Sequence, residues 1–160
     1  LWANFRQFVE LNISNQEAWF EKLKSDGNTI MFAIRTLPVV SLAEETSILL
    51  GACGHTYIDW KNRKAEVSIY IGEPENHNKG YGGEVLNLLM RYGFDELGMH
   101  RLFAEVYEFN TPSLKLFESA GFQQEGMFRE GLYRNGKWNS SVLFSILENE
   151  WRQENDRNNM

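Results

Sequence analysis

The sequence contains a single cysteine, Cys53, and therefore no pair of cysteines that could form a disulfide within the chain. Cys53 ends the apolar run 49–53, where a small buried thiol is favoured over a reactive nucleophile. A chain of 160 residues buries about two thirds of its unfolded surface, so it needs no metal ion or disulfide for stability. We therefore expect one domain over residues 1–160, without a metal site, in a reducing compartment such as the cytoplasm.

A long apolar segment is also missing. No stretch approaches the roughly 18 apolar residues of a membrane-spanning helix, and residues 1–6 lack the basic and apolar regions of a secretion signal. The net charge of −6, from 16 basic and 22 acidic side chains, disfavours nucleic-acid phosphates and favours a cationic partner. We expect a cytoplasmic protein that binds neither membranes nor nucleic acids. The sequence does not decide between a monomer and a homodimer. The chain begins without methionine in a segment of helical character, which leaves room for a missing N-terminal segment.

The first half of the sequence predicts one helix followed by strands. Ser14 and Glu17 have the spacing of a capping box, and apolar residues follow them at helical intervals. β-Branched and aromatic residues predict the strands. The expected segments are a helix at about 15–25, a strand at 29–35, a loop at 36–47, and a hairpin of strands 48–57 and 65–71.

Side chains alternate between two faces along the strand 65–71. The odd-numbered residues after Ala65 are Val67, Ile69 and Ile71, and they are expected to face the core. The even-numbered residues begin with Glu66 and face the other side. That second face could line a functional site.

The second half of the sequence alternates strands with helices, which predicts a mixed α/β fold. A long helix is expected over 81–97, closed by Gly98, with a buried face made of Val85, Leu88, Leu89 and Tyr92. The other expected segments are a strand at 102–107, a short helix that opens at Thr111 and Pro112, and strands at 122–127 and 138–147 around a turn at 134–137.

A glycine-rich loop, residues 77–83, lies between a predicted strand and the long helix. Small residues at a helix start let backbone N–H groups approach an anion such as a pyrophosphate. The loop lacks the Gly-Lys-Ser/Thr ending of an NTP-binding loop, and Val85 stands where a dinucleotide fingerprint requires glycine or alanine. Coenzyme A is the remaining common pyrophosphate ligand, and a helix start without a ligand is the alternative.

Further motifs follow the glycine loop in a fixed order. They are His100-Arg101, Asn110-Thr111-Pro112-Ser113, the segments 117–122 and 125–130, and Asn135-Gly136-Lys137-Trp138. In this combination the sequence resembles the GNAT superfamily of N-acetyltransferases, whose acetyl-CoA motif is Gln/Arg-x-x-Gly-x-Gly/Ala. The later motifs are similar to the branch that acetylates ribosomal-protein N-termini and to related polyamine and amino-sugar acetyltransferases. The resemblance covers about residues 14–147 and implies a mostly antiparallel central sheet flanked by helices, and acetyl transfer from acetyl-CoA to a primary amine.

Two residues depart from the family pattern. His77 stands at the Gln/Arg position, which changes one phosphate contact while the backbone contacts remain. Phe117 stands where many members have a tyrosine that protonates the departing thiolate. A thiolate is a modest base, with a pKa of about 8.5 by comparison with cysteine, so it need not be protonated as it leaves.

The resemblance also implies a set of site residues. Backbone N–H groups of the strand before the loop, near Ile69, Tyr70 and Ile71, are expected to hold the oxyanion. Asn110 is expected to contact the pantetheine arm and to cap its helix, and Ser113 to contact the cofactor or thiol, unless it is only a solvated first-turn serine. The expected catalytic residues are Glu66 and Ser113. The expected cofactor-binding residues are Ile69, Tyr70, Ile71, His77, Asn78, Lys79, Gly80, Tyr81, Gly82, Gly83, Asn110, Ser113 and Phe117.

The reaction requires a base. An alkylamine, with a pKa of about 10, is protonated at neutral pH and must lose a proton before it attacks a thioester. Glu66 is the leading candidate, because it lies on the non-core face of the strand and related enzymes have a glutamate there. His55 and a water chain are the rivals, and a solvated Glu66 without a role is the alternative. Aromatic residues could shape an acceptor pocket, although most are expected in the core: Trp19, Phe20, Trp60, Tyr107 and Trp138.

The identity of the acceptor stays open between a peptide N-terminus, a polyamine and an amino-sugar nucleotide, because one cofactor platform serves all three. A coenzyme A-binding regulatory module without catalysis is the alternative from another functional class, and the phenylalanine at position 117 permits it. The glutamate at position 66 favours an enzyme.

Overall fold

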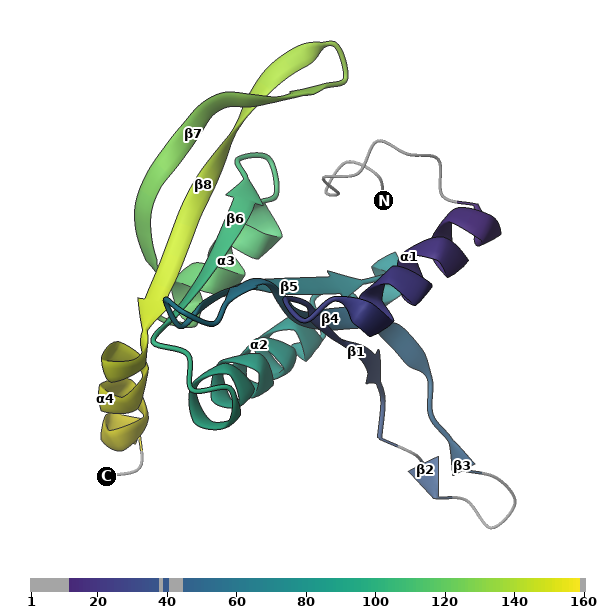
Figure 1. Ribbon diagram of the computed structural model, residues 1–160, viewed down its shortest axis with the longest axis horizontal. Coiled ribbons are helices and arrows are strands. Elements are labelled where there is room, and N and C mark those ends of the chain that lie inside the picture. The colour runs from purple at the N-terminus through teal and green to yellow at the C-terminus, as the bar shows by residue number, and fades with distance from the viewer. Residues whose placement is uncertain (1–11, 38, 41–44, 159–160) are drawn as a thin grey trace.

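The computed structural model describes residues 12–37, 39–40 and 45–158 (Figure 1). The helical segment expected at the start of the chain lies outside these residues. A six-stranded sheet with the order β1-β4-β5-β6-β8-β7 forms the centre of the fold. Its strands are β1 (Ile30–Arg35), β4 (Leu49–Asp59), β5 (Lys64–Ile71), β6 (Arg101–Tyr107), β7 (Gln123–Arg134) and β8 (Lys137–Leu147).

Neighbouring strands in this sheet are antiparallel, except for β5 and β6, which run parallel. The mixed, mostly antiparallel sheet flanked by helices is therefore confirmed, as is the predicted hairpin, which is β4–β5. Two short strands, β2 (Val39–Val40) and β3 (Glu45–Thr46), pair separately where only a loop was expected, so that prediction is wrong. β7 also continues to Arg134, well beyond the predicted end at residue 127.

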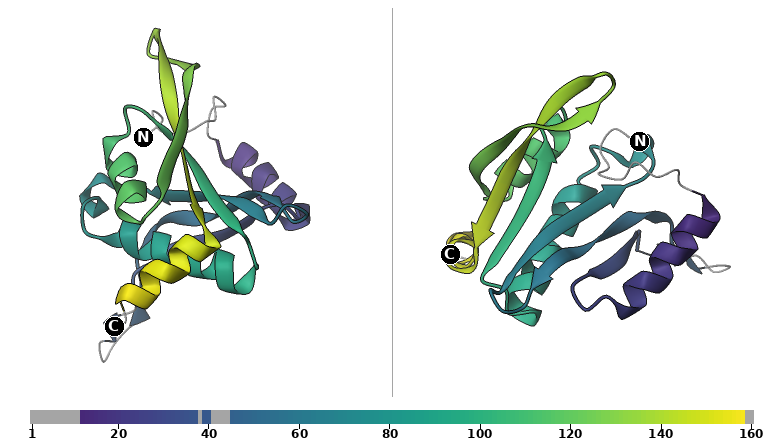
Figure 2. Two further views of the ribbon diagram at one scale, coloured as in Figure 1. Left: turned by 90° about the vertical axis from the view of Figure 1, so that its left-hand side faces the viewer. Right: turned by 45° about the horizontal axis from the view of Figure 1, so that its top comes forward.

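The parallel strands β5 and β6 separate soon after they meet. Their pairing runs from Lys64 with Arg101 to Glu66 with Phe103 and ends there, whereas β6 pairs with β8 along its whole length. Beyond Glu66, β5 continues beside β4 alone, and Figure 2 shows β5 and β6 diverging. Among the residues that the structure describes, the divergence leaves one edge of β5 without a paired strand in the middle of the sheet.

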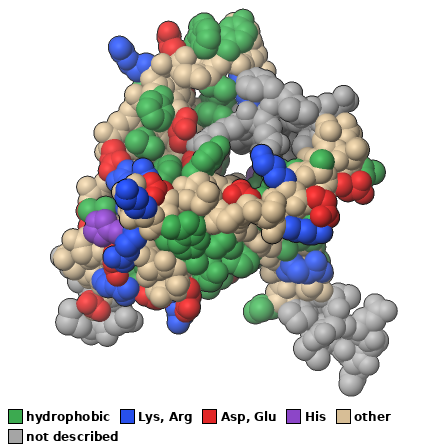
Figure 3. All heavy atoms as spheres, in the orientation of Figure 1, with side chains coloured by type: hydrophobic (Ala, Val, Ile, Leu, Met, Phe, Trp, Pro, Cys, Tyr) green, Lys and Arg blue, Asp and Glu red, His purple; other side chains and the backbone are tan. Residues whose placement is uncertain are grey.

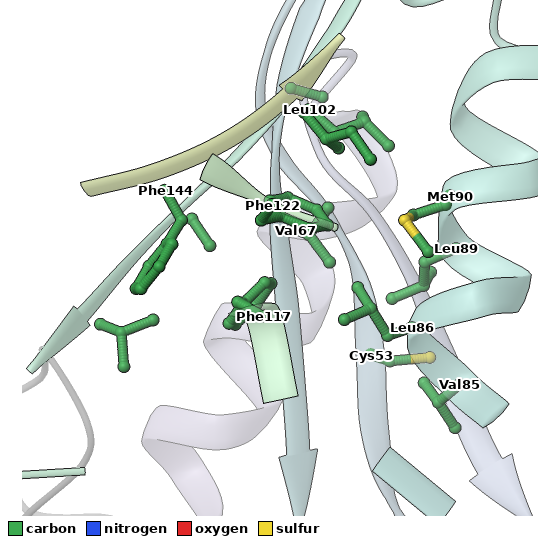
Figure 4. Packing of buried hydrophobic residues seen from close by; sticks show 14 of the residues in the cluster. Cys53, Val67, Val85, Leu86, Leu89, Met90, Leu102, Phe117, Phe122 and Phe144 are labelled. Carbon is green, nitrogen blue, oxygen red and sulfur yellow. The ribbon is translucent and has the colours of Figure 1, made fainter. Parts of the chain in front are cut away.

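The core lies on the face of the sheet that is covered by α2 (Tyr81–Arg91), the π-helical turn η3 (Tyr92–Glu96) and α3 (Thr111–Ser119) (Figure 4). Burial of each large apolar side chain contributes roughly 1.5–3 kcal/mol to stability. This packing fixes α2, and with it the glycine loop, against the sheet. The residues of the core include Val67, Leu86, Leu89, Leu102, Phe117, Phe122 and Phe144.

The helix starts and ends differ from the predictions in two places. α1 (Ile13–Ser25) is capped by Asn12, whose side chain accepts a hydrogen bond from the N–H of Asn15 at 2.8 Å. The capping box at Ser14 is therefore wrong although the helix is confirmed, because asparagine and serine are equally good caps and stand two positions apart. The C-terminal helix α4 (Glu148–Asn158) was not predicted.

The long helix expected over 81–97 is interrupted. It is α-helical to Arg91 and then forms a π-helical turn, in which the N–H of Leu97 donates to the carbonyl of Tyr92 at 3.0 Å. Leu88 is 65% exposed, so its placement in the core was wrong. Apolar residues at five positions between 85 and 90 allow two overlapping stripes, and packing on the sheet selects the one formed by Val85, Leu86, Leu89 and Met90.

Candidate active site

The glycine loop connects β5 to α2. A short turn, η2 (Pro74–Asn76), follows β5, and the chain then passes through two residues with positive φ, Asn78 at 59° and Gly80 at 89°. Gly80 is the N-cap of α2, and glycine adopts this left-handed conformation without a steric penalty. The N–H groups of Gly83 and Glu84 bond back to the Gly80 carbonyl. The N–H groups of the helix positions before them lack an intrahelical acceptor and are available to an anion.

The loop is open to solvent up to the helix start. His77, Lys79 and their neighbours Asn78 and Gly80 are exposed, while Tyr81, Gly82 and Gly83 are half-buried. Tyr81 packs against the core. A Cβ atom at Gly82 would lie 3.4 Å from a methyl group of Leu116 on α3, so the starts of α2 and α3 are neighbours.

The open edge of β5 presents backbone groups next to this loop. The N–H of Gly72 donates to the carbonyl of Leu50 on β4 at 2.8 Å. Because backbone groups of successive residues in a strand point to opposite edges, those of Ile71 and Ile69 point away from β4, toward the separating β6. The N–H of Tyr70 faces β4. Of the three residues expected to hold an oxyanion, Ile69 and Ile71 therefore have the suitable direction.

Glu66 lies where β5 and β6 part. It is only 6% exposed, and its neighbours across the strands are Thr56 on β4 and Phe103 on β6. The hydroxyl of Thr56 donates to a Glu66 carboxylate oxygen at 3.4 Å. Glu66 faces away from the α2 side of the sheet, as the alternation predicted. A solvated carboxylate at a strand edge is therefore not what the structure contains.

His55 lies on the opposite face of the sheet from Glu66. It is fully buried and pairs with the core residue Val67 across the two strands. Its ring packs near Tyr92, and a Cβ at Gly93 would lie 2.9 Å from its Nε2. Burial lowers the pKa of His55 to about 4, and the Leu89 carbonyl opposes this shift only in part. This position argues against His55 as the base that accepts a proton from an amine.

Asn110 and Ser113 lie together at the start of α3. The side chain of Asn110 accepts a hydrogen bond from the N–H of Ser113 at 3.4 Å, so Asn110 is the N-cap that the sequence predicted. Both residues are half-buried. Phe117, one turn further on, is 6% exposed, and its ring packs against Phe122 and Phe144. Phe117 is thus a core residue, so its packing gives no support to the cofactor contact expected of it.

A second carboxylate on the Glu66 face was missed from the sequence. Glu105 is half-buried on β6, two residues after Phe103, and therefore on the same face as Phe103 and Glu66. The hydroxyl of Ser141 on β8 donates to it at 2.6 Å. The alternation of residues 101–107 would have indicated this face, because Leu102, Ala104 and Val106 are the apolar set.

The aromatic residues proposed for an acceptor pocket are mostly not in the core. Tyr107 is buried on the Glu66 face, and the guanidinium of Arg134 lies 5.7 Å from the centre of its ring. The indole of Trp60 donates to the Gly27 carbonyl at 2.8 Å, which attaches the end of α1 to the β4–β5 turn. The expectation of a core position is wrong for the four half-exposed rings, Trp19, Phe20, Trp60 and Trp138.

Charged and apolar side chains of one face are drawn in Figure 3. Within the part of the chain that the structure describes, His, Cys, Asp and Glu side chains do not gather in threes as a metal site would require. Among the same residues, each helix is too short or too polar to cross a bilayer.

The acetyltransferase (GNAT) domain model matches residues 2–123, and the chain belongs to this family. The uncharacterized N-acetyltransferase p20 of Bacillus licheniformis is 37% identical over 111 residues, which are 69% of this chain and 61% of p20. The chain therefore spans less than two thirds of that relative. The spermidine N-acetyltransferase SpeG of Vibrio cholerae, solved in complex with CoA and spermine, has a TM-score of 0.79 at 24% identity over 91% of this chain and 81% of that one. A dodecameric structure of this enzyme matches with a TM-score of 0.77 at the same identity, over 89% and 78%. These structures share the fold.

Proposed function

We propose that the protein transfers an acetyl group from acetyl-CoA to a primary amine by direct attack in a ternary complex. The observation that carries the proposal is the buried Glu66 at the point where β5 and β6 part, on the strand whose open edge leads to the glycine-capped start of α2. Membership of the GNAT family supports the same reaction.

In this proposal the pyrophosphate of coenzyme A lies at the start of α2. The N–H groups of the first helical turn and the positive end of the helix dipole attract an anion there. The pantetheine arm extends along the open edge of β5 toward Asn110 and Ser113, and the thioester lies near Glu66.

The chemistry then follows from the residues at the opening between β5 and β6, which begins at Glu66. Glu66 takes a proton from the ammonium group, directly or through one water, and the free amine attacks the thioester carbonyl carbon. The N–H of Ile69, the nearer of the two to Glu66 along β5, stabilises the negative charge on the carbonyl oxygen. The C–N bond has then formed, the nitrogen releases its extra proton to water, the carbonyl double bond is restored as the C–S bond breaks, and coenzyme A leaves as the thiolate.

The acceptor class is a cationic amine. The carboxylates of Glu66 and Glu105 share one face, and the chain has a net charge of −6, so an ammonium group is attracted to this opening. The V. cholerae enzyme of the same fold was solved with spermine, which favours a polyamine over an amino-sugar nucleotide. The same enzyme is dodecameric in one structure, and we propose that this protein also forms oligomers.

Thiol release from acetyl-CoA with a panel of amines tests the function. A polyamine, a peptide with a free N-terminus and an amino-sugar nucleotide are compared, and release with at least one of them is expected. The alternative function, a regulatory module that binds coenzyme A, predicts cofactor binding by calorimetry with no release for any amine.

A bulky side chain at the start of α2 should weaken the binding of acetyl-CoA. We expect Gly82→Leu to weaken acetyl-CoA binding at least tenfold, because the side chain blocks backbone approach by the pyrophosphate and crowds Leu116. Calorimetry measures the dissociation constant and circular dichroism checks folding. Asn87→Leu, at an exposed position of the same helix, is the control. Unchanged affinity in folded Gly82→Leu would separate the loop from the binding site.

A hydroxyl group at position 117 should increase the turnover rate only slightly. We expect Phe117→Tyr to change the turnover rate less than threefold, because a thiolate is a stable leaving group and the ring is buried among Phe122 and Phe144. The measurement is kcat with the best amine of the panel, corrected for the folded fraction. A gain of tenfold or more would mean that the natural protein lacks an acid it needs.

A further inference from the structure

The ring of His77 is turned back toward β5. Its Nε2 lies 3.0 Å from the carbonyl oxygen of Ile71. A carbonyl oxygen only accepts hydrogen bonds, so Nε2 carries the hydrogen in this contact. The side chain at the Gln/Arg position of the phosphate motif is thus engaged with the protein itself.

The Ile71 carbonyl is a particular acceptor. It belongs to the same peptide group as the N–H of Gly72, which donates to Leu50 on β4 at 2.8 Å. In a trans peptide the C=O and N–H point in opposite directions, so the Ile71 carbonyl points to the open edge of β5. Pairing with β6 has already ended at Glu66 in this sheet. His77 therefore supplies a donor to a strand carbonyl that its neighbouring strand does not reach.

His77 is held at two points. Its backbone N–H donates to the carbonyl of Pro74 at 3.0 Å, and its ring reaches Ile71. The positive-φ residues Asn78 and Gly80 follow directly, and α2 begins after them. The ring thereby connects the start of the glycine loop to the end of the strand that carries the N–H groups of Ile69 and Ile71.

We infer that His77 is a positioning residue, which braces the glycine loop against β5 and does not itself bind the phosphates. The inference rests on the proposed function. In the proposed binding mode, the pyrophosphate lies on the loop side of this brace and the thioester lies on its β5 side. Holding them at a fixed spacing before binding lowers the ordering cost that the cofactor would otherwise meet.

Hydrogen exchange of the protein without cofactor tests the brace directly. In His77→Ala we expect the amides of residues 72, 73 and 75–80 to exchange about 3- to 10-fold faster, the range that follows from losing one ordinary hydrogen bond. His77→Gln should restore slow exchange, because its side-chain amide can donate to the same carbonyl. His100→Ala, an exposed histidine elsewhere, is the matched control. Unchanged exchange in His77→Ala overturns the inference.

Cofactor binding supplies the second measurement. His77→Ala should raise the acetyl-CoA dissociation constant and KM about 3- to 10-fold while kcat changes less than twofold, and His77→Gln should return both to within twofold. Faster exchange with an unchanged dissociation constant would show a brace that does not serve the cofactor, and would overturn the positioning role. Absence of acetyl-CoA binding by the natural protein would instead refute the proposed function, and the exchange comparison distinguishes the two failures.

Discussion

Glu66→Gln should lower turnover at neutral pH by about 10²- to 10⁴-fold, which is the usual effect of removing a general base. Glutamine keeps the shape of the side chain and can still accept the hydrogen bond from Thr56, so the fold should be retained. The dissociation constant of acetyl-CoA should change little, because the substitution removes a proton acceptor and leaves the loop and the β5 edge intact.

The pH dependence of this loss separates a base from a structural residue. As the pH rises toward about 10, the acceptor is increasingly present as free amine without help from the enzyme, so the difference between Glu66→Gln and the natural protein should shrink. Steady-state kcat between pH 7 and about 9.5 measures it. Glu118→Gln, the same chemical change at an exposed position on α3, should leave kcat unaltered. Full turnover by Glu66→Gln at neutral pH would move the role to Glu105 or to a water chain.

The direction of Glu66 could be predicted from the sequence, but its burial could not. Alternation along β5 separates Glu66 from Val67 using local information only. Burial to 6% exposure depends on Phe103 and on the place where β6 departs, which involves residues nearly 40 positions later. The same limit explains why Glu105 was missed, because its position on the face of Glu66 is evident only when β6 is placed beside β5 in parallel.

The cap of α1 and the presence of α4 also differ from the sequence prediction, for separate reasons. Asn12 and Ser14 are both good helix caps, and nothing nearby decides between them. α4 was missed because its sequence from Glu148 is strongly polar, with Trp151 as its one large apolar side chain, so it shows no apolar stripe. That tryptophan packs against Phe94 at 5.1 Å between ring centres, a tertiary contact that periodicity does not reveal.

His55 shows how register decides a role. The sequence predicts His55 within the strand 48–57 as a rival base to Glu66. Its pairing with Val67 puts it on the core face, and the π-helical turn at Gly93 lies against it. A histidine there is neutral, because burial penalises the charged form.

The buried His55 should make the protein sensitive to acid. Its pKa is lowered from 6.5 to about 4 in the folded state. Above pH 6.5 the ring is neutral in both states and the full stability is present. As the pH falls from about 6.5 to 4 the unfolded chain takes up the proton and the folded chain does not, so the free energy of unfolding should drop by up to about 3 kcal/mol. Urea unfolding at pH 7.5, 6 and 5 measures this slope.

His55→Leu identifies the source of the slope and also tests the assignment of the base. Leucine has a similar volume and no titrating group, so the variant should lose most of the decrease in stability between pH 6.5 and 5. His100→Gln removes an exposed histidine and should keep the decrease. Because His55 lies across the sheet from Glu66, folded His55→Leu should also retain most of its turnover at neutral pH. A variant that is stable at pH 7.5 but has lost turnover a hundredfold would restore His55 as the base, and an unchanged slope would place the acid sensitivity in other groups.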